Sequence, residues 1–346
     1  MKLSDIKITP LLDSLRFTKI DDSVYFSEKY ANYISNSRLS ILKASPKKPN
    51  KFFKGLAFNY SYSDSLNRGS AVHEMVLQPE YFFIVDKFNK PTGKTGAMAD
   101  ELYKKSGGIP TYQEMLDASK KIHYYEKTFN SKKADTLISS CEAYWKARAA
   151  YECSEEFYLD GRTPIYLDSK SRELVNNSIN SLNNNEEVQS LLHMDGEIGN
   201  EQAILMNIKV DCPDCKPFIL RLKSKLDNYC INKLTNTITI NDIKTTGSPI
   251  YMFNDSISKF SYNREMAMYS YLLSKVAEKD YGLSNPTIKS NFLTVEMGNN
   301  FKSKVFPLSN KLLMEGFKDF QYLLKLVCFY TTLQEYEGFR EELIDI

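Results

Sequence analysis

Asp242 and Lys244 stand two residues apart in NTITINDIKTT, a run rich in β-branched residues that predicts a strand. Side chains two apart on a strand point to the same face, so this carboxylate and this ammonium group would lie side by side. Ion pairs of this kind are common on protein surfaces, where they do no chemistry. The pair alone therefore leaves both a surface ion pair and a catalytic centre open.

A second carboxylate, Asp227, lies fifteen residues upstream at the polar end of LRLKSKLDNY, which also predicts a strand. If the two strands form a hairpin, Asp227 and Asp242 meet at one end of the sheet. With the backbone carbonyl of Ile243 they would supply the oxygen ligands that Mg²⁺ or Mn²⁺ prefers. Lys244 could then hold an attacking water or stabilise developing negative charge. This arrangement predicts metal-assisted phosphodiester hydrolysis.

The predicted strands lie in the second half of the chain. EQAILMNIKV, which begins at Glu201, FILRLKSKLDNYCI and NTITINDIKTT predict an antiparallel meander, with DCPDCKP as its first turn. The segments that follow predict a helix, a strand and a final helix, at 259–277, 290–297 and 310 to about 335. This order predicts a mixed α/β core.

The first half of the chain predicts mainly helices, at 38–44, 67–78, 111–152 and 169–193. Residues 88–110 are polar and contain glycine, which predicts a mobile loop or a small insertion. Residues 1–30 predict a loosely structured arm, in which Pro10 acts as a breaker. We therefore expect an arm and then one domain over 31–346, with a helical portion at 31–195 and a catalytic sheet core at 196–300.

Composition restricts the function less than the motifs do. The formal net charge of +2, from 45 basic and 43 acidic residues, neither requires nor excludes a nucleic-acid partner. Six cysteines in 346 residues form no dense framework, so we expect reduced thiols. The start MKLSDIKITPLLDSLRF lacks the apolar region of a signal peptide, and no apolar run reaches the roughly 20 residues of a membrane span. We expect a cytoplasmic protein without a membrane partner.

Four sequence blocks, in order and with plausible gaps, resemble those of the RecE (exonuclease VIII) family of phage and prophage exonucleases, within the PD-(D/E)XK nuclease superfamily. They are ISNSRLSILKASPKK, GSAVHEMVLQPEYF, the pair KSKLD and DIKTT, and YNREMAMYS, and they span about Ile34 to Leu273. DIKTT alone is weakly specific, whereas the four blocks in order are strongly specific.

The resemblance implies a restriction-endonuclease-like core, which is a mixed sheet flanked by helices, with a helical N-terminal portion. It implies a 5′→3′ exodeoxyribonuclease that acts on linear double-stranded DNA with two Mg²⁺ or Mn²⁺ ions, in phage recombination or replication. A ring-shaped homo-oligomer, a single-strand annealing partner and a place in the bacterial host cytoplasm are implied as well. An endonuclease or structure-specific nuclease on the same core, or a non-catalytic DNA-binding or assembly protein, stay open as alternatives.

The resemblance also implies roles for individual residues. His73, Glu201, Asp227 and Asp242 would surround the metals, together with the carbonyl of Ile243. Lys244 would be the catalytic lysine, and Glu265 and Tyr269, one helical turn apart, would both face the site. A lone histidine on a helix is more often a packed or surface residue, and acidic residues at strand starts are common, so His73 and Glu201 have ordinary alternatives.

The chain departs from the family pattern at several of these positions. Glu265 replaces the usual Gln, and an ionised carboxylate only accepts hydrogen bonds. Lys223 and Lys225, which we expect to contact DNA, stand where the family favours Arg, so bidentate phosphate binding is lost. Leu226 replaces the proline before the first Asp. None of these changes removes the metal ligands.

Two further motifs have competing interpretations. Ser35, Ser37 and Arg38 at a helix start suit either a capped surface helix or a contact with a 5′-phosphate or the DNA backbone. Cys212 and Cys215 form a CxxC that we assign to a turn rather than to zinc, and we expect no iron–sulfur cluster.

Overall fold

The structure, a computed structural model, describes residues 2–332 except 45, 47–49, 54–63, 87–89, 107–109, 126, 153–160, 214 and 299. The chain forms two compact units. The first contains Met1–Phe58 and Ser178–Ile346, and the second contains Asn59–Asn177. The sequence predicts one domain after an arm, so a separate unit inserted between two parts of the first is an additional feature.

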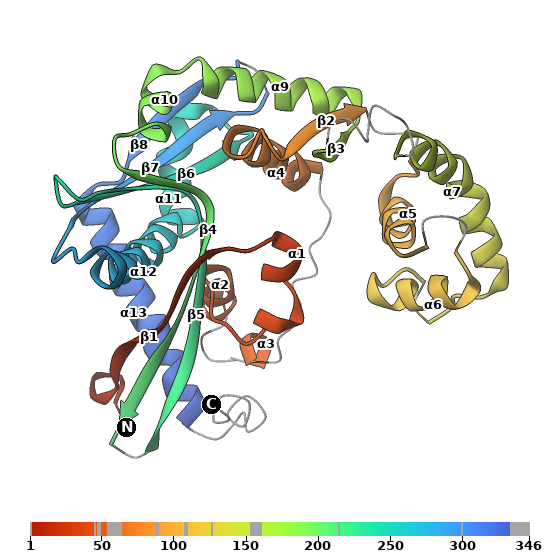
Figure 1. Cartoon of the computed structure of the whole chain (residues 1–346). Coiled ribbons are helices and arrows are strands. Elements are labelled where there is room, and N and C mark those ends of the chain that lie inside the picture. The colour runs from red at the N-terminus through yellow and green to blue at the C-terminus, as the bar shows by residue number, and fades with distance from the viewer. Residues whose placement is uncertain are drawn as a thin grey trace. The chain divides into compact units, whose positions relative to one another are not determined.

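The first unit is built on a six-stranded sheet in the order β1-β4-β5-β6-β7-β8 (Figure 1). β6 and β7 run parallel, whereas the other neighbouring pairs are antiparallel. The bounds are β1 (Lys7–Lys19), β4 (Glu197–Cys212), β5 (Cys215–Asn232), β6 (Thr237–Thr246), β7 (Thr287–Glu296) and β8 (Ser303–Pro307). The expected mixed sheet flanked by helices is confirmed, and the expected meander is β4-β5-β6.

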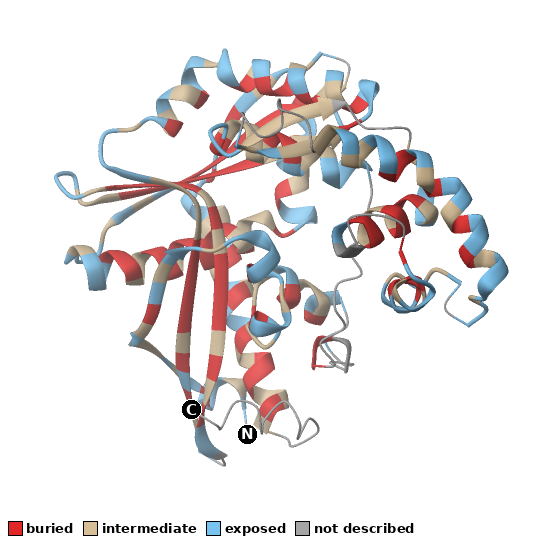
Figure 2. Cartoon of the chain, turned by 45° about the vertical axis from the view of Figure 1, so that its right-hand side comes forward, coloured by how far each residue is buried: buried red, intermediate tan, exposed pale blue. Residues whose placement is uncertain are grey.

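The inner strands are apolar because both of their faces are covered. Residues 238–243 of β6 and 290–296 of β7 are all buried, and Figure 2 shows buried stretches along the sheet. The helical elements of this unit are η1 (Leu3–Asp5), α1 (Asp22–Tyr25), η2 (Glu28–Tyr30), α2 (Asn36–Ala44), α3 (Asn50–Phe53), α10 (Glu186–Leu192), η3 (Ile250–Met252), α11 (Phe253–Lys259), α12 (Tyr262–Tyr281) and α13 (Asn310–Thr332).

α12 is the helix that carries Glu265 and Tyr269. Its apolar residues recur at helical spacing, and Met266, Leu273 and Val276 are fully buried. It ends at Gly282, which has a φ of +67° and donates its N–H to Ala277 O. α12 packs against β1, β4, β5, β6 and β7, and α13 packs against α12. The helix thereby covers one face of the sheet.

The second unit is mainly helical. Its elements are α4 (Asp64–Leu77), β2 (Phe82–Asp86), α5 (Gly93–Ser106), α6 (Tyr112–Lys121), α7 (Ser131–Glu152), β3 (Thr163–Leu167) and the start of α9 (Ser169–Asn183), which ends in the first unit. α5, α6 and α7 share a core around Trp145, whose indole N–H donates to Ala99 O at 2.9 Å. β2 and β3 pair in parallel. Within the described part of the chain, no helix is long and apolar enough to cross a membrane.

Two segments differ from their predictions. Part of the expected arm is β1, an edge strand that pairs with β4. An edge strand tolerates Pro10, and its pairing shifts between Leu11 and Arg16, which interrupts the alternating pattern. The segment at 88–110, expected as a mobile loop or a small insertion, lies in the inserted unit and contains α5, in which Met98 and Leu102, four residues apart, are fully buried. The flanking glycines and proline hid this short periodicity.

The cysteines also correct one expectation. Cys212 is disulfide-bonded, so the prediction of reduced thiols is wrong for this residue. Its register partner across the β4–β5 hairpin is Cys215, and the tight turn brings the two strand ends together. Cys141, Cys230 and Cys328 are free and buried, and Cys153 lies outside the described residues.

Candidate metal centre

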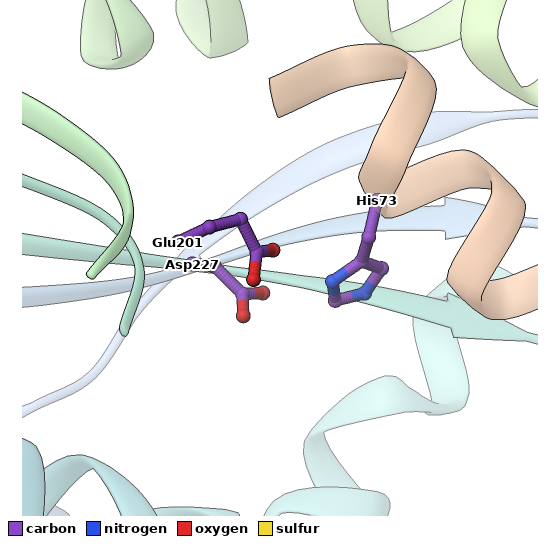
Figure 3. Close-up of side chains that lie close together, drawn as sticks. All are labelled: His73, Glu201 and Asp227. Atoms are coloured by element: carbon purple, nitrogen blue, oxygen red, sulfur yellow. The ribbon is translucent and has the colours of Figure 1, made fainter. Parts of the chain in front are cut away.

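Glu201 and Asp227 occupy opposite positions on neighbouring strands. β4 and β5 are antiparallel, and Asn200 is paired with Asn228, so the next position along β4 faces the preceding position on β5. Carboxylate oxygens of Glu201 and Asp227 lie within 4.8 Å of one another, and Figure 3 shows both carboxylates pointing the same way. The meander therefore brings together two acidic residues that are 26 positions apart in the sequence.

Asp242 extends this pair into a row across three strands. Asn228 of β5 pairs with Asn241 of β6, so Asp227 and Asp242 are the next opposite positions. The β5–β6 ladder ends at that point, because β5 continues beside β4 while β6 continues beside β7. Ile243 N–H thus has no strand partner on β5, and it donates to Asp227 Oδ2 at 2.8 Å. The three carboxylates stand where the two strands diverge.

Lys244 lies beside this row, two residues after Asp242 on the same face of β6. Its Nζ is 2.7 Å from Asp242 Oδ2, 3.1 Å from Glu265 Oε2 and 4.8 Å from the centre of the Tyr262 ring. Asp242 is 1% exposed, and its Oδ2 receives no hydrogen bond of normal geometry from the described residues besides this ion pair. The hairpin and the shared face that the sequence predicts are therefore present.

The ionisation of these groups reflects a buried excess of carboxylates. Burial raises the pKa of Asp227 to about 7, and the charge of Glu201 adds to the rise. Burial raises the pKa of Asp242 to about 8 in spite of Lys244, with Asp227 and Glu265 contributing. Burial lowers the pKa of Lys244, but Asp242, Glu265 and Asp227 outweigh it and hold that pKa well above its usual value. Such a cluster favours a further cation.

Glu265 and Tyr269 both face the row from α12, as the sequence predicts. Glu265 Oε2 accepts from Lys244, and its Oε1 accepts from the Tyr269 hydroxyl at 3.4 Å. The carboxylate of Glu265 offers each donor an oxygen of its own, whereas a glutamine would have to serve both donors through its single side-chain oxygen. This gives a physical account of Glu265 at a position where the family that the sequence blocks resemble usually has Gln.

Lys223 and Lys225 are placed differently from the DNA-facing lysines that we expected. Lys225 Nζ forms ion pairs with Glu201, at 2.6 Å, and with Asp22 of α1. Lys223 is 7% exposed, and its Nζ donates to Tyr25 O at 2.8 Å. Both ammonium groups therefore bind protein oxygens, and Lys225 lies next to the carboxylate row.

The predicted phosphate motif at the start of α2 also has internal partners. The Ser35 hydroxyl accepts from Arg38 N–H at 3.3 Å and caps the helix, and it lies 2.9 Å from the Ser37 hydroxyl. Arg38 is 8% exposed, and its guanidinium donates to Phe52 O and to Ala31 O. A phosphate contact by Arg38 would require these bonds to break, whereas helix capping is directly present.

His73, the remaining predicted ligand, lies on α4 of the second unit and is half-buried there. Glu201, Asp227 and Asp242 belong to the first unit. Glu201 and Asp227 bring carboxylate oxygens within 4.8 Å of one another, and Asp242 occupies the next position of the row. Carboxylate oxygens are the ligands that Mg²⁺ and Mn²⁺ prefer. The buried Asp242 Oδ2, with no hydrogen bond of normal geometry among the described residues, supports the same interpretation. The residues present therefore fit a divalent metal.

The asparagines beside the carboxylates have no predicted role in the sequence. Asn200, Asn228 and Asn241 each directly adjoin one of the three acidic residues, in the pairs NE, DN and ND. These asparagines are hydrogen-bonded to one another across the sheet. An asparagine next to each acidic residue is visible in the sequence. Only the register of the strands shows that these asparagines lie opposite one another.

Comparisons with known proteins add little to this geometry. No known protein family matches the sequence, and no curated protein is significantly similar to it. A crystal structure of a protein from Eubacterium rectale, named a "putative exonuclease", is similar with a TM-score of 0.33 and 10% identity, over 81% of this chain and 86% of that chain. So distant a likeness says nothing about activity, which has to be inferred from the site itself.

Proposed function

We propose that this protein is a metal-dependent deoxyribonuclease of the PD-(D/E)XK class. The observation that supports it most is the row of Glu201, Asp227 and Asp242 at the point where β5 and β6 diverge, with Lys244 beside it. Lys244 is paired with Asp242 and Glu265, and Lys225 with Glu201, so the carboxylates here outnumber the lysines that contact them. Each uncompensated carboxylate that is removed from water costs desolvation energy, and such clusters gather at functional sites. A divalent cation at the row would offset that cost.

In this proposal the side chains have separate tasks. Glu201, Asp227 and Asp242 hold the metal, and His73 is a further ligand, as the sequence blocks imply. When bound, the metal supplies Lewis-acid chemistry to the phosphodiester. Lys244 places a positive charge beside the row, where it would stabilise phosphate oxygens as they gain negative charge. Glu265 fixes the Lys244 ammonium through Oε2.

The finer assignment is a 5′→3′ exonuclease that digests linear double-stranded DNA from its ends, with two Mg²⁺ or Mn²⁺ ions, in phage recombination or replication. This assignment rests on the resemblance of the four sequence blocks to the RecE family. The same resemblance supports a ring-shaped homo-oligomer and a single-strand annealing partner. The carboxylate row supports only the coarser assignment, because it fits any nuclease of the class.

A time course on linear and covalently closed circular duplexes of the same sequence tests the proposal. With Mg²⁺ we expect nucleotide release from the linear duplex, no cut in the circle and no release in EDTA. Ends with a 5′-phosphate and a 5′-hydroxyl, each labelled at the 5′ or the 3′ terminus, report end preference and polarity. Cleavage of the circle would support an endonuclease instead. Binding of either duplex without cleavage would overturn the enzymatic proposal in favour of a DNA-binding or assembly protein.

A further inference from the structure

Four asparagine side chains form a continuous row across four adjacent strands. Asn291 Nδ2 on β7 donates to Asn241 Oδ1 on β6 at 2.9 Å. Asn241 Nδ2 donates to Asn228 Oδ1 on β5 at 2.8 Å, and Asn228 Nδ2 donates to Asn200 Oδ1 on β4 at 2.7 Å. The same residues are register partners in the backbone pairing. We call Asn200, Asn228, Asn241 and Asn291 the asparagine ladder.

The ladder is an interior structure. Asn228, Asn241 and Asn291 are all buried, and Asn241 Nδ2 also donates to Leu191 O of α10 at 3.0 Å. Each amide in the middle both accepts and donates, and buried hydrogen bonds of this kind strengthen one another. A buried amide that loses its partner is costly, so the four strands are held in one relative register.

The ladder and the carboxylate row are adjacent but on opposite faces. Asn200 precedes Glu201, Asn228 follows Asp227 and Asn241 precedes Asp242, and successive side chains on a strand alternate between faces. The ladder crosses β5 and β6 at Asn228 and Asn241, their last hydrogen-bonded pair before the divergence. The ladder therefore holds β5 and β6 together one residue before the point where their backbone pairing ends.

The backbone at Glu201 adds an independent observation. Its φ is +54°, a left-handed conformation that a residue other than glycine seldom adopts. Strain of this kind persists only where the surroundings enforce it, and it gathers at functional sites. Asn200, directly before Glu201, is tied to β5 by the Asn228 amide. The strained residue is thus anchored by the ladder on one side and faces Asp227 on the other.

We propose that the asparagine ladder is a positioning device for the metal centre, which holds Glu201 in its left-handed conformation and keeps the three carboxylates in one row. This inference rests on the proposed function, since it takes the row to be a metal site. The asparagines would act through the carboxylates and touch no metal themselves. Partners behind metal ligands commonly change metal affinity by about 10- to 100-fold when they are lost.

Mn²⁺ binding, measured by isothermal titration calorimetry without DNA, tests the proposal. Asn200 is half-buried and acts in the ladder as an acceptor, so Asn200→Leu removes one link without opening the core. We expect Asn200→Leu to weaken Mn²⁺ binding by about tenfold or more. Asn200→Asp keeps an acceptor oxygen, and we expect an affinity within about threefold of wild type or tighter. If Asn200→Leu does not fold, Asn200→Ser replaces it in the test, because the shorter serine side chain does not reach the Asn228 amide.

Asn207, half-buried on the same strand and outside the ladder, provides the matched control. Asn207→Leu is expected to bind Mn²⁺ as wild type does. If Asn200→Leu and Asn200→Ser keep wild-type affinity, or if Asn207→Leu weakens binding equally, the ladder has no positioning role. If the wild-type protein itself binds no Mn²⁺, the proposed metal centre fails instead, so the two failures are distinguishable.

Discussion

At the residue scale, Asp242 shows how much charge this site confines. It is 1% exposed, and the charges of Asp227 and Glu265 act on it directly. A buried carboxylate requires a compensating positive charge, and Lys244 supplies one at 2.7 Å. The lysine therefore has an electrostatic task in the metal-free protein and, in our proposal, a catalytic task with DNA.

Lys244→Met should separate these two tasks. Removing the ammonium takes away stabilisation of the reacting phosphate, so we expect nucleotide release from linear duplex to fall at least about 100-fold. Mn²⁺ affinity should stay the same or rise, because a competing cation has left the carboxylates. Calorimetry and a release assay on the same preparation measure both. A variant that lost Mn²⁺ affinity and kept its release rate would contradict the assigned role.

Arg38 stabilises the fold through hydrogen bonds to backbone carbonyls in this structure. Its guanidinium satisfies the carbonyls of Phe52 and Ala31, so Arg38→Met leaves two carbonyls without these donors. Phe52 is buried whereas Ala31 is exposed, so only the Phe52 carbonyl would lose its partner without access to water. We expect a loss of about 1–3 kcal/mol in the free energy of unfolding, which is roughly the cost of one unpaired buried group. Urea unfolding measures it, with the exposed Arg16→Met as a control expected within about 0.5 kcal/mol of wild type. Equal stability of Arg38→Met and wild type would free Arg38 for the phosphate contact that the sequence suggests.

At the element scale, the segment α1–η2 packs over β5 and encloses Lys223. Its Nζ lies 4.5 Å from the centre of the Tyr25 ring and 5.9 Å from that of Tyr30. Burial lowers the pKa of Lys223 to about 8, and the charge of Arg38 contributes. The aromatic rings favour the cation, yet burial dominates. The buried charge therefore weakens the packing of this segment at neutral pH.

The pH dependence of stability tests this conclusion. Between pH 8 and the ordinary lysine value of 10.5, the unfolded chain binds more protons at Lys223 than the folded chain does. The wild type should therefore gain free energy of unfolding over this window relative to Lys223→Met, and the difference should be flat below it. Urea unfolding at several pH values measures the difference. A constant difference from pH 7 to 10.5 would show that the folded lysine has an ordinary pKa.

The elements that carry the site were the predictable part of the fold. Regular alternation and β-branched residues identified β4, β5 and β6, and the periodicity of α12 placed Glu265 and Tyr269 on one face. β1 was missed because Pro10 and a shift in pairing break its pattern. The left-handed backbone of Glu201 and the asparagine ladder depend on register between strands, which no single segment of sequence contains.

At the scale of the whole molecule, the four sequence blocks are divided between the two units. Three blocks lie in the first unit, and GSAVHEMVLQPEYF with His73 lies in the second. The sequence predicts His73 as a ligand by resemblance alone, because a single histidine on a helix has no distinguishing pattern. Its role as a metal ligand stays a proposal.

His73→Ala tests whether the second unit supplies a ligand. We expect Mn²⁺ affinity to fall about tenfold or more, as for other losses near a metal. His193→Ala is the control, because that histidine is exposed at the end of α10 and should leave the affinity unchanged. Calorimetry on the intact protein measures both variants. Unchanged binding in His73→Ala would leave the three carboxylates as the proposed ligands from the first unit.

The most direct test of the central claim is the initial rate of nucleotide release from linear duplex DNA by Asp242→Asn and wild type at the same Mg²⁺ concentration. Asn keeps the shape of the side chain and removes the charge that would hold the metal. If the carboxylate row is a nuclease centre, we expect Asp242→Asn to release nucleotides at least about 100-fold more slowly than wild type. Equal rates for the two proteins would contradict it.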